Sequence, residues 1–297
     1  MQWGSFYSLI ALGYTLVYGV LLLINFAHGD IFMVGAYISF FVTAVLLGSY
    51  TVGLPFALSG TMVLALAVPL TMILTAFVGV MLERIAYRPL RRKGVNRLYV
   101  VITALMCGLI LENGNLALLG ASRKSFPEIL EKVVYSVGSF SMTNLKLLVI
   151  FSAILVFVIL QIIVTRTKIG MAMRAISYDK FAVPLMGIPI DTIIVFTFIL
   201  GSSLAGLAGL LFAMSYPVLD PFMGSLIGWK AFIAAVVGGI GDIRGAFVGG
   251  FLLGFIEILV MAVFPSTFRD LIAFSILLII LSMKPTGIFG VARTTKI

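Results

Sequence analysis

The sequence predicts an all-α integral membrane protein with about eight or nine transmembrane helices. Hydrophobic residues make up 62% of the 297 residues and charged residues only 10%, and the mean hydropathy is +1.21. A bilayer can solvate that much apolar surface, provided that each span satisfies its own backbone hydrogen bonds. The apolar runs are roughly 20 residues long, which favours helices over the short alternating strands of a membrane barrel. We therefore expect a multi-pass membrane protein.

Apolar segments follow one another along the chain and are joined by polar connections. We predict spans at residues 5–24, 31–48, 54–82, 98–119, 146–165, 192–214, 226–240, 246–264 and 271–283. The first is expected to stay in the protein, because no basic residue precedes it and no cleavage pattern follows it. The segments together predict a single transmembrane domain over residues 1–297.

Basic residues fall between the apolar segments, as expected of a topology signal. The first is Arg84, and six Lys and Arg residues lie within 84–97. The positive-inside bias makes this loop cytoplasmic, which places the loop 120–145 outside and the loop 165–191 inside. The net charge of +9 follows from these loops, and the basic residues are not interleaved with an aromatic surface. We therefore expect the lipid membrane, and no nucleic acid, as a partner.

Two polar, glycine-containing interruptions occur in corresponding places of the two halves, and both lead into helices rich in small residues. The first holds Asn25, His28, Gly29 and Asp30, and the second holds Gly238, Gly239, Gly241 and Asp242. Matching interruptions indicate discontinuous helices that line a solute pathway. The alternative is that each is a tight turn, in which the Asp caps the next helix and the glycines allow close packing. Whether the chain has eight or nine spans depends on which of these two interpretations holds. The residues that discriminate between a solute pathway and a tight turn are Asn25 and His28.

Three ionisable residues lie within predicted spans, namely Glu112, Lys230 and Glu257. A charge in hydrocarbon costs roughly 2.5–3.5 kcal/mol on insertion scales, so such residues usually face protein or water. Lys230 either reaches the outer surface with its long side chain or pairs with Glu257. For Glu257 we expect an interior pair, with Lys230 or Arg244, in preference to contact with a solute.

The second cytoplasmic loop contains a short amphipathic helix over residues 171–180, after which Pro184, Gly187 and Pro189 turn the chain back into the bilayer. A solvated connector needs no such helix, so the segment indicates a docking element. The alternative is a basic topological anchor whose helical pattern is incidental.

Several enzyme classes are disfavoured by missing motifs. No G-x-x-x-x-G-K-[ST] pattern occurs, so the chain is not expected to bind ATP, and no G-x-S-x-G elbow is found. A single histidine excludes an H-E-x-x-H zinc site, and no strand precedes the glycines at 238–245, which argues against a dinucleotide loop. We expect no catalytic residues, no metal site and no cofactor bound by this chain.

Six stretches, in this order, resemble branched-chain amino acid ABC transporter permeases of the LivH type. They are residues 9–19, 24–30, 83–91, 170–175, 230–241 and 284–290. The resemblance covers nearly the whole chain. It departs from the family in a short N-terminus before Ser5 and in Asp30, where Glu is also common.

The resemblance implies one permease subunit of an ATP-driven importer in a bacterial or archaeal cytoplasmic membrane. Its partners would be a second, LivM-like permease or a second copy, two cytoplasmic ATPases that bind and hydrolyse ATP, and an external solute-binding protein. The loop 165–191 would dock on the ATPase through Arg174, Ala175, Ser177, Asp179, Gly187 and Ile188.

The substrates implied first are leucine, isoleucine and valine, and the alternatives within such importers are urea, short amides or other small acids. A different class is a self-sufficient channel or ion-coupled carrier. In that class the acids Asp30, Glu112, Asp242 and Glu257 would handle ions or protons.

Overall fold

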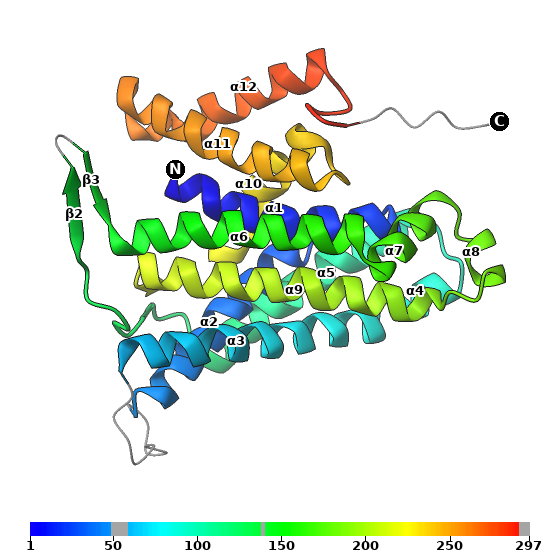
Figure 1. The fold of residues 1–297 in the computed structure, drawn as a ribbon, viewed down its shortest axis with the longest axis horizontal. Helices are drawn as coiled ribbons and strands as arrows, with labels where there is room; N and C mark the ends of the chain where they lie inside the picture. Colours follow the sequence, from blue (N-terminus) through cyan, green and yellow to red (C-terminus); the bar gives the residue numbers. More distant parts are fainter. Residues whose placement is uncertain (49–58, 138–139, 291–297) are drawn as a thin grey trace. The chain divides into compact units, whose positions relative to one another are not determined.

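The computed structural model describes residues 1–48, 59–137 and 140–290, and these residues are mainly helical (Figure 1). The helices are α1 (Gln2–Leu21), α2 (His28–Leu46), α3 (Gly60–Leu82), α4 (Arg88–Arg92), α5 (Arg97–Leu119), α6 (Asn144–Arg166), α7 (Lys168–Tyr178), α8 (Ala182–Leu185), α9 (Ile190–Ser215), α10 (Met223–Gly239), α11 (Ile243–Val263) and α12 (Arg269–Met283). The predicted all-α fold is confirmed.

Eight helical segments of the described residues are long and apolar enough to cross a membrane, and α10 is a shorter apolar helix. These segments match the predicted spans closely, although residues 54–58 of the third predicted span lie outside the described residues. Both interruptions separate distinct helices, α1 from α2 and α10 from α11. The count of eight or nine spans is therefore confirmed, and neither interruption lies within one continuous helix.

The chain forms two compact units. Unit 1 contains Met1–Leu22, Ser152–Thr197 and Trp229–Ile297, and unit 2 contains Leu23–Phe151 and Phe198–Gly228. The single permease domain expected over residues 1–297 stays a prediction.

One prediction about local structure is wrong: the predicted loop 83–97 is largely helical. The α3 helix continues through a π-helix, Glu83–Tyr87, into α4, so that one helical segment runs from Gly60 to Arg92. Pro89 is the second residue of α4 and comes directly after the π-helix, where the regular helical hydrogen-bond pattern is already interrupted. The helix stops where Gly94 adopts a left-handed conformation, with a φ of 63°.

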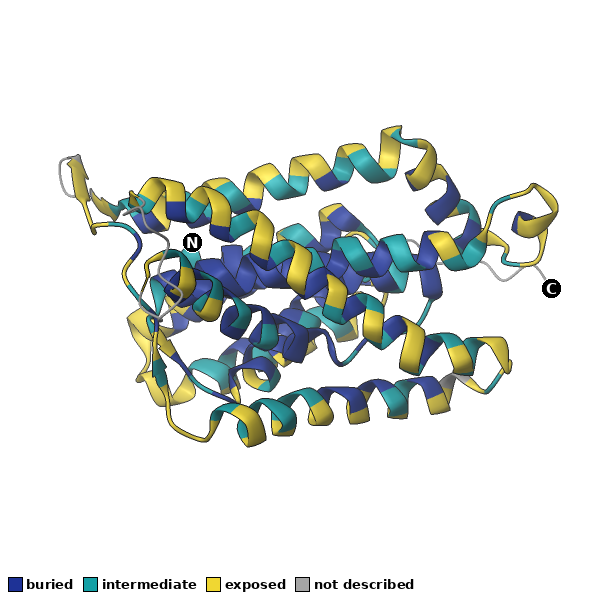
Figure 2. Ribbon diagram, turned by 90° about the horizontal axis from the view of Figure 1, so that it is seen from below, coloured by how far each residue is buried: buried dark blue, intermediate teal, exposed yellow. Residues whose placement is uncertain are grey.

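Several helices bury one side and expose the other (Figure 2). In α3 the buried residues include Val63, Ala67, Thr71, Thr75 and Gly79, which follow one another at intervals of one helical turn. Large apolar side chains such as Ile73 and Phe77, exposed by 64% and 63%, lie on the rest of the helix. An apolar exposed face is expected where a helix contacts lipid, because lipid solvates apolar side chains.

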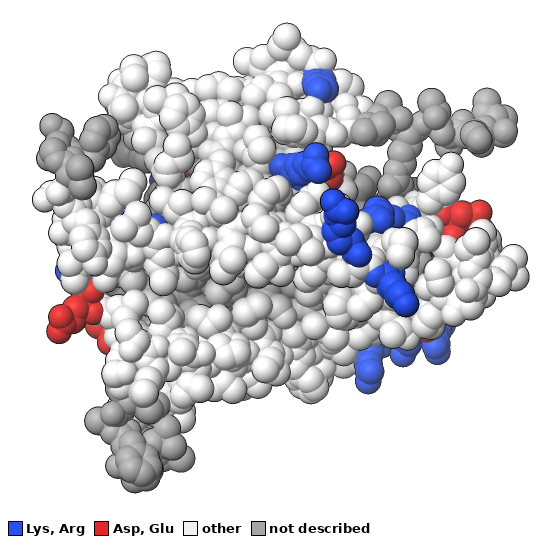
Figure 3. Space-filling view, in the orientation of Figure 1, with Lys and Arg blue, Asp and Glu red and all other residues white. Residues whose placement is uncertain are grey.

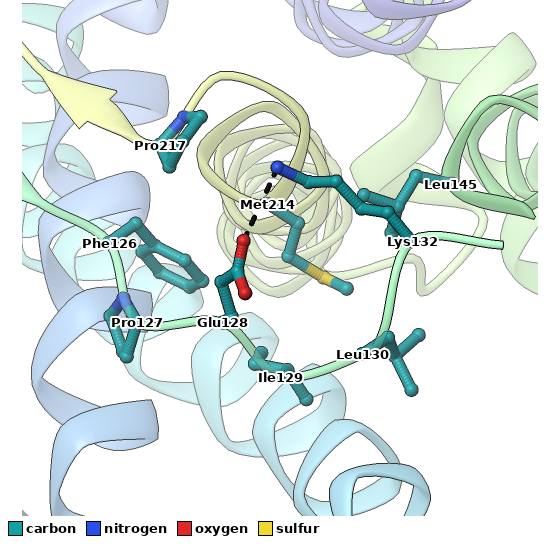
Figure 4. Close-up of a pocket in the computed structure, with 9 residues that line it drawn as sticks. All are labelled: Phe126, Pro127, Glu128, Ile129, Leu130, Lys132, Leu145, Met214 and Pro217. Atoms are coloured by element: carbon teal, nitrogen blue, oxygen red, sulfur yellow. Dashed lines mark ion pairs between the residues drawn. The ribbon is translucent and has the colours of Figure 1, made fainter. Parts of the chain in front are cut away.

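The connection 120–145 contains short strands that were not predicted. Strand β2 (Val134–Val137) pairs with β3 (Phe140–Thr143) as an antiparallel hairpin, and β1 (Lys124–Ser125) pairs with β4 (Val218–Leu219). Figure 4 shows the adjoining segment, where the Glu128 and Lys132 side chains form an ion pair of 3.4 Å above Met214. The cavity there has a volume of about 10 Å³, which leaves room for little more than one water molecule.

Within unit 1, α1 packs closely on α11 through small residues. Gly250 lies against the backbone of Ser8, and Gly254 lies against Gly4. The Ser8 hydroxyl also donates a hydrogen bond of 2.8 Å to the carbonyl oxygen of Phe247. Small residues at such crossings let two membrane helices approach closely enough for backbone contact.

We expect Gly250→Val to destabilise the protein by about 1–3 kcal/mol, the usual cost of overpacking. A Cβ at position 250 would overlap the Ser8 amide nitrogen, which belongs to the helix backbone and cannot rotate away. Gly114→Val is the matched control, because a Cβ there meets nothing within 4 Å. Unfolding of the purified chain by SDS titration measures both variants, and equal losses would contradict the close α1–α11 packing.

Candidate functional site

The first interruption forms a buried polar turn at the start of α2, in unit 2. The side chains of Asn25 and His28 are each 1% exposed, and Asp30 is 7% exposed. The turn is closed by the His28 amide, which donates a hydrogen bond of 3.1 Å to the carbonyl oxygen of Asn25. Because buried polar groups are costly in an apolar environment, their presence here calls for a structural or functional reason.

Asn25 is held by Tyr87, a residue of the π-helix that follows α3. The Tyr87 hydroxyl donates a hydrogen bond of 2.6 Å to Asn25 Oδ1. The Tyr87 ring packs against Phe198, with a distance of 5.3 Å between the ring centroids. Sequence reasoning missed Tyr87 because it placed this residue in an aqueous loop. The signal available was that Tyr87 lies in one of the stretches shared with LivH-type permeases.

A buried acid lies one turn before Tyr87. Glu83 is 0% exposed and forms an ion pair of 3.0 Å with Arg91, whose side chain is 19% exposed. Its second oxygen, Oε2, has no hydrogen-bond partner within the described part of the chain. π-Helical turns occur frequently at functional sites, and this one places Glu83 and Tyr87 in the interior of unit 2.

Asp30 does not cap α2, contrary to one of the two interpretations of the first interruption. The cap position is Ala27, no side chain bonds to the free amides there, and Asp30 lies within the first turn. Its carboxylate lies between two glycines, with Oδ2 against Gly108 of α5 and Oδ1 directed toward Gly224 of α10. Glu112 follows Gly108 by one turn and therefore lies on the same side of α5.

Gly29 has a packing role at this site. A Cβ at this position would lie 2.6 Å from the Gly224 carbonyl oxygen and 2.7 Å from the Gly228 Cα. The start of α2 therefore crosses α10 at backbone contact, which only glycine permits.

A donor and an acceptor of the first interruption are among the buried side-chain atoms that have no hydrogen-bond partner within the described residues. They are Asn25 Nδ2 and Asp30 Oδ1, both buried. Buried polar atoms of this kind usually have a partner, so these two are candidates for contact with a solute.

The second interruption, in unit 1, is a tight turn in which Asp242 caps α11. Asp242 Oδ1 accepts hydrogen bonds from the amides of Arg244, at 2.7 Å, and Gly245, at 3.0 Å. Gly239 and Gly241 have φ values of 112° and 97°, which favour glycine. The capping interpretation is confirmed for Asp242.

The C-terminal stretch 284–290 packs on this turn. The amides of Ile288 and Phe289 donate hydrogen bonds of 2.8 and 2.9 Å to the carbonyl oxygens of Val237 and Gly238. Gly238 lies against Gly245, so a side chain at position 238 would separate α10 from α11. These contacts give the glycines a packing role.

Lys230 and Glu257 form the interior ion pair that the sequence predicted. Lys230 Nζ lies 3.0 Å from Glu257 Oε1 and 2.6 Å from Asp270 Oδ1. Their side chains are 4% and 1% exposed, so Lys230 does not reach the outer surface. Tyr7 donates a hydrogen bond of 2.9 Å to the second oxygen of Glu257. This cluster therefore joins α1, α10, α11 and α12 of unit 1.

The predicted amphipathic helix is present as α7. Thr167 caps its first turn by accepting a hydrogen bond of 3.1 Å from the Gly170 amide, and its buried side packs on α1. Asp179 ends the helix and accepts hydrogen bonds of 2.8 and 3.1 Å from the amides of Phe181 and Ala182. Gly187 has a φ of 76°, which turns the chain toward α9.

The residues expected to dock on an ATPase lie in different settings. Arg174 is exposed and donates to the Val164 carbonyl oxygen, Ala175, Ser177 and Ile188 are half-buried, and Asp179 and Gly187 are exposed. Sequence reasoning missed the apolar side chains that extend from the same segment. They are Tyr178, Phe181, Leu185 and Met186, exposed by 89%, 90%, 90% and 77%.

A polytopic helical protein with buried polar groups at a helix junction has the construction of a membrane transport protein. The family model described as "Branched-chain amino acid transport system / permease component" matches residues 1–281, and the chain belongs to this family. It is a multi-pass protein of the plasma membrane.

Relatives match over nearly the whole length. The high-affinity branched-chain amino acid transport system permease protein BraD of Pseudomonas aeruginosa is 38% identical, over 99% of this chain and 94% of the relative. The permease proteins LivH of Escherichia coli and Salmonella typhimurium are 35% and 36% identical over the same shares. No solved structure matches the chain.

Proposed function

We propose that this chain is the membrane-spanning permease subunit of an ATP-driven importer for branched-chain amino acids. The observation that carries the proposal is the family match over residues 1–281, together with 38% identity to a branched-chain amino acid permease along 99% of the chain. The chain forms the membrane passage and performs no catalysis. It binds no cofactor itself, and ATP is bound and hydrolysed by partner subunits.

The solute passes beside the first interruption, which comprises Asn25, His28, Gly29 and Asp30. Its support is the buried cluster with one donor, Asn25 Nδ2, and one acceptor, Asp30 Oδ1, that have no partner among the described residues. An amino acid carries a carboxylate that accepts hydrogen bonds and an ammonium group that donates them. The two groups of the cluster therefore complement the two charged groups of the solute.

At the second interruption, Gly238, Gly239, Gly241 and Asp242 shape the pathway indirectly. Their contacts favour a turn that keeps α10 and α11 in backbone contact and anchors the C-terminal stretch 284–290. Glu112 lies on α5, on the side that faces Asp30. Lys230 and Glu257 stabilise unit 1.

The partners are two cytoplasmic ATPases, a second permease of the LivM type and an external solute-binding protein. The segment from α7 to Ile188 forms the ATPase contact. Arg174, Ala175, Ser177, Asp179, Gly187 and Ile188 belong to it, and so do the exposed side chains of Tyr178, Phe181, Leu185 and Met186. A cluster of four large exposed apolar side chains in one short segment is typical of a protein–protein contact.

Reconstitution tests this function. We expect leucine uptake into proteoliposomes only when the chain is assembled with its partner permease, the ATPases, the binding protein and ATP. Uptake by the isolated chain in the absence of ATP would refute the importer and favour an ion-coupled carrier. Competition by isoleucine and valine, and none by urea or short amides, is expected for the proposed substrate class.

A double variant separates the ATPase contact from folding. Phe181→Ser with Leu185→Ser should leave the fold intact, because both side chains are 90% exposed, and should reduce uptake and ATPase capture together by about tenfold or more. Tyr135→Ser, exposed by 55% in strand β2, is the matched control and should capture the ATPase normally. Full capture by the double variant would place the ATPase contact elsewhere.

A further inference from the structure

A cavity of about 340 Å³ lies in unit 1 between α1, the end of α6, α7 and the turn before α11. Its volume falls near the lower end of the range of about 300–1,000 Å³ that is typical of ligand pockets. The floor is apolar, because Leu16, Val20, Met173 and Ile243 line it and are all buried. An apolar floor of this kind favours the hydrocarbon part of a ligand.

Two polar side chains, Thr15 and Arg174, also line the cavity, and Arg174 makes its exposed end positively charged. Thr15 lines it and is 1% exposed, and its hydroxyl oxygen has no hydrogen-bond partner within the described residues. Arg174 lines the exposed end and donates one hydrogen bond, to the Val164 carbonyl oxygen. A guanidinium group has five N–H donors in a fork that matches oxyanions, so Arg174 can bind an anion as well. The ligand therefore carries an anionic group at one end.

The electrostatics favour a ligand without a positive charge. None of the described residues that line the cavity is Asp or Glu. The nearby Asp242 carboxylate already accepts hydrogen bonds from two backbone amides at the start of α11. Among the described lining residues, the ammonium group of a free amino acid would find no carboxylate. Arg166 and Lys168 add positive charge where α6 ends and α7 begins. Figure 3 shows basic side chains gathered near the junction of α6 and α7.

The surroundings indicate where the ligand comes from. Both α1 and α6 are candidate membrane spans, and α7 is amphipathic, with Ala172, Met173 and Ile176 buried and charged residues exposed. Basic pockets between membrane helices bind anionic lipid headgroups. The cavity thus lies where the headgroup and upper acyl chain of a lipid are available.

We infer that this cavity binds an anionic phospholipid. One acyl chain occupies the apolar floor, the phosphate binds Arg174, and the Thr15 hydroxyl donates to an ester oxygen of the lipid. The bound lipid would join α1, α6 and α7, so it would hold α7 against the rest of unit 1. The inference goes beyond the proposed transport function. Arg174 belongs both to the cavity and to the proposed ATPase contact, so the lipid is tested on the isolated chain, where no ATPase is present.

Native mass spectrometry of the delipidated, full-length chain in detergent tests the inference. The probes are phosphatidylglycerol and phosphatidylcholine with the same acyl chains. Both lipids carry the phosphate, but the choline group of phosphatidylcholine would bring a positive charge beside Arg174, where no lining residue is acidic. We therefore expect one retained phosphatidylglycerol, bound about tenfold more tightly than phosphatidylcholine. Arg174→Gln should remove this preference. Arg123→Gln, which removes the same charge from an exposed side chain of unit 2, should retain it.

A second variant tests the apolar part without changing charge. Gly19→Leu should fill the cavity, because a Cβ at Gly19 makes only ordinary contact with Gly241 at 3.5 Å. We expect it to weaken phosphatidylglycerol retention about tenfold, with unchanged helicity and elution volume. Equal retention of the two lipids, or normal retention in both Arg174→Gln and Gly19→Leu, would overturn the inference. Displacement of the lipid by millimolar inorganic phosphate would show a free-anion site instead.

Discussion

Replacing Lys230 with methionine is expected to destabilise the protein by about 3–5 kcal/mol, because it leaves a buried charge without its partner. Glu257 is 1% exposed and lies 3.0 Å from Lys230. Asp270, the second partner of Lys230, is 41% exposed and keeps Arg269 at 3.0 Å. The loss should therefore come mainly from Glu257. SDS titration of the purified chain measures the free energy of unfolding, and the yield of monodisperse protein should fall with it.

A double variant distinguishes the loss of charge balance from the loss of packing. Adding Glu257→Gln to Lys230→Met removes the stranded charge and leaves an amide that can still accept a hydrogen bond from Tyr7. We expect the double variant to be clearly more stable than Lys230→Met alone. If the two variants unfold alike, or the double variant is worse, the ion pair is not what stabilises unit 1.

Replacing Asp30 with asparagine is expected to reduce leucine uptake by about 10- to 100-fold while the amount of folded complex stays constant. The two side chains have nearly the same shape, so the variant fits between Gly108 and Gly224 but lacks the negative charge that would bind an ammonium group. Asn25→Leu should reduce uptake as well, because it removes the amide donor. Uptake in proteoliposomes, divided by the folded complex measured by size-exclusion chromatography, gives the effect.

The control for Asp30 is Asp220→Asn. Asp220 forms an ion pair of 3.1 Å with Arg123, and both side chains are well exposed, so its loss should change stability by less than about 1 kcal/mol. The folded yield of Asp220→Asn shows how much folded complex is lost when an acid is changed to an amide outside a buried site. Normal uptake by Asp30→Asn would refute solute contact. A loss of uptake in proportion to folded complex would assign Asp30 to packing.

The helices could be predicted from the sequence because each span must satisfy its backbone hydrogen bonds locally and carry apolar side chains over a length that crosses the bilayer. Both requirements are visible as long apolar runs in the sequence. Run length and hydropathy were therefore sufficient to place the helices. The interior pair of Lys230 and Glu257 could also be predicted, since a charge within a span needs a partner. Capping by Asp242 was one of two interpretations that the sequence left open, and the structure confirms it for Asp242 but not for Asp30.

The polar cluster needed the tertiary structure. The continuation of α3 through Glu83–Tyr87 was misjudged because basic residues suggested an aqueous loop, and hydropathy carries no information about a π-helical turn. The hydrogen bond between Tyr87 and Asn25 could not be predicted either, because the two residues are far apart in the chain and local sequence patterns do not show that they meet. The failure of Asp30 to cap α2 also appeared only when the helix was seen to begin at His28.

The sequence by itself determined the membrane class, the positions of the spans and the resemblance to LivH-type permeases, because these depend on composition and on residues close together in the chain. Only the tertiary structure decided which other polar groups meet: Asn25 with Tyr87, Glu83 with Arg91, and Lys230 with Asp270. The physical reason is that a buried polar atom is satisfied by whichever helix packs beside it. Helix packing depends on contacts between residues distant in sequence, which local periodicity does not specify.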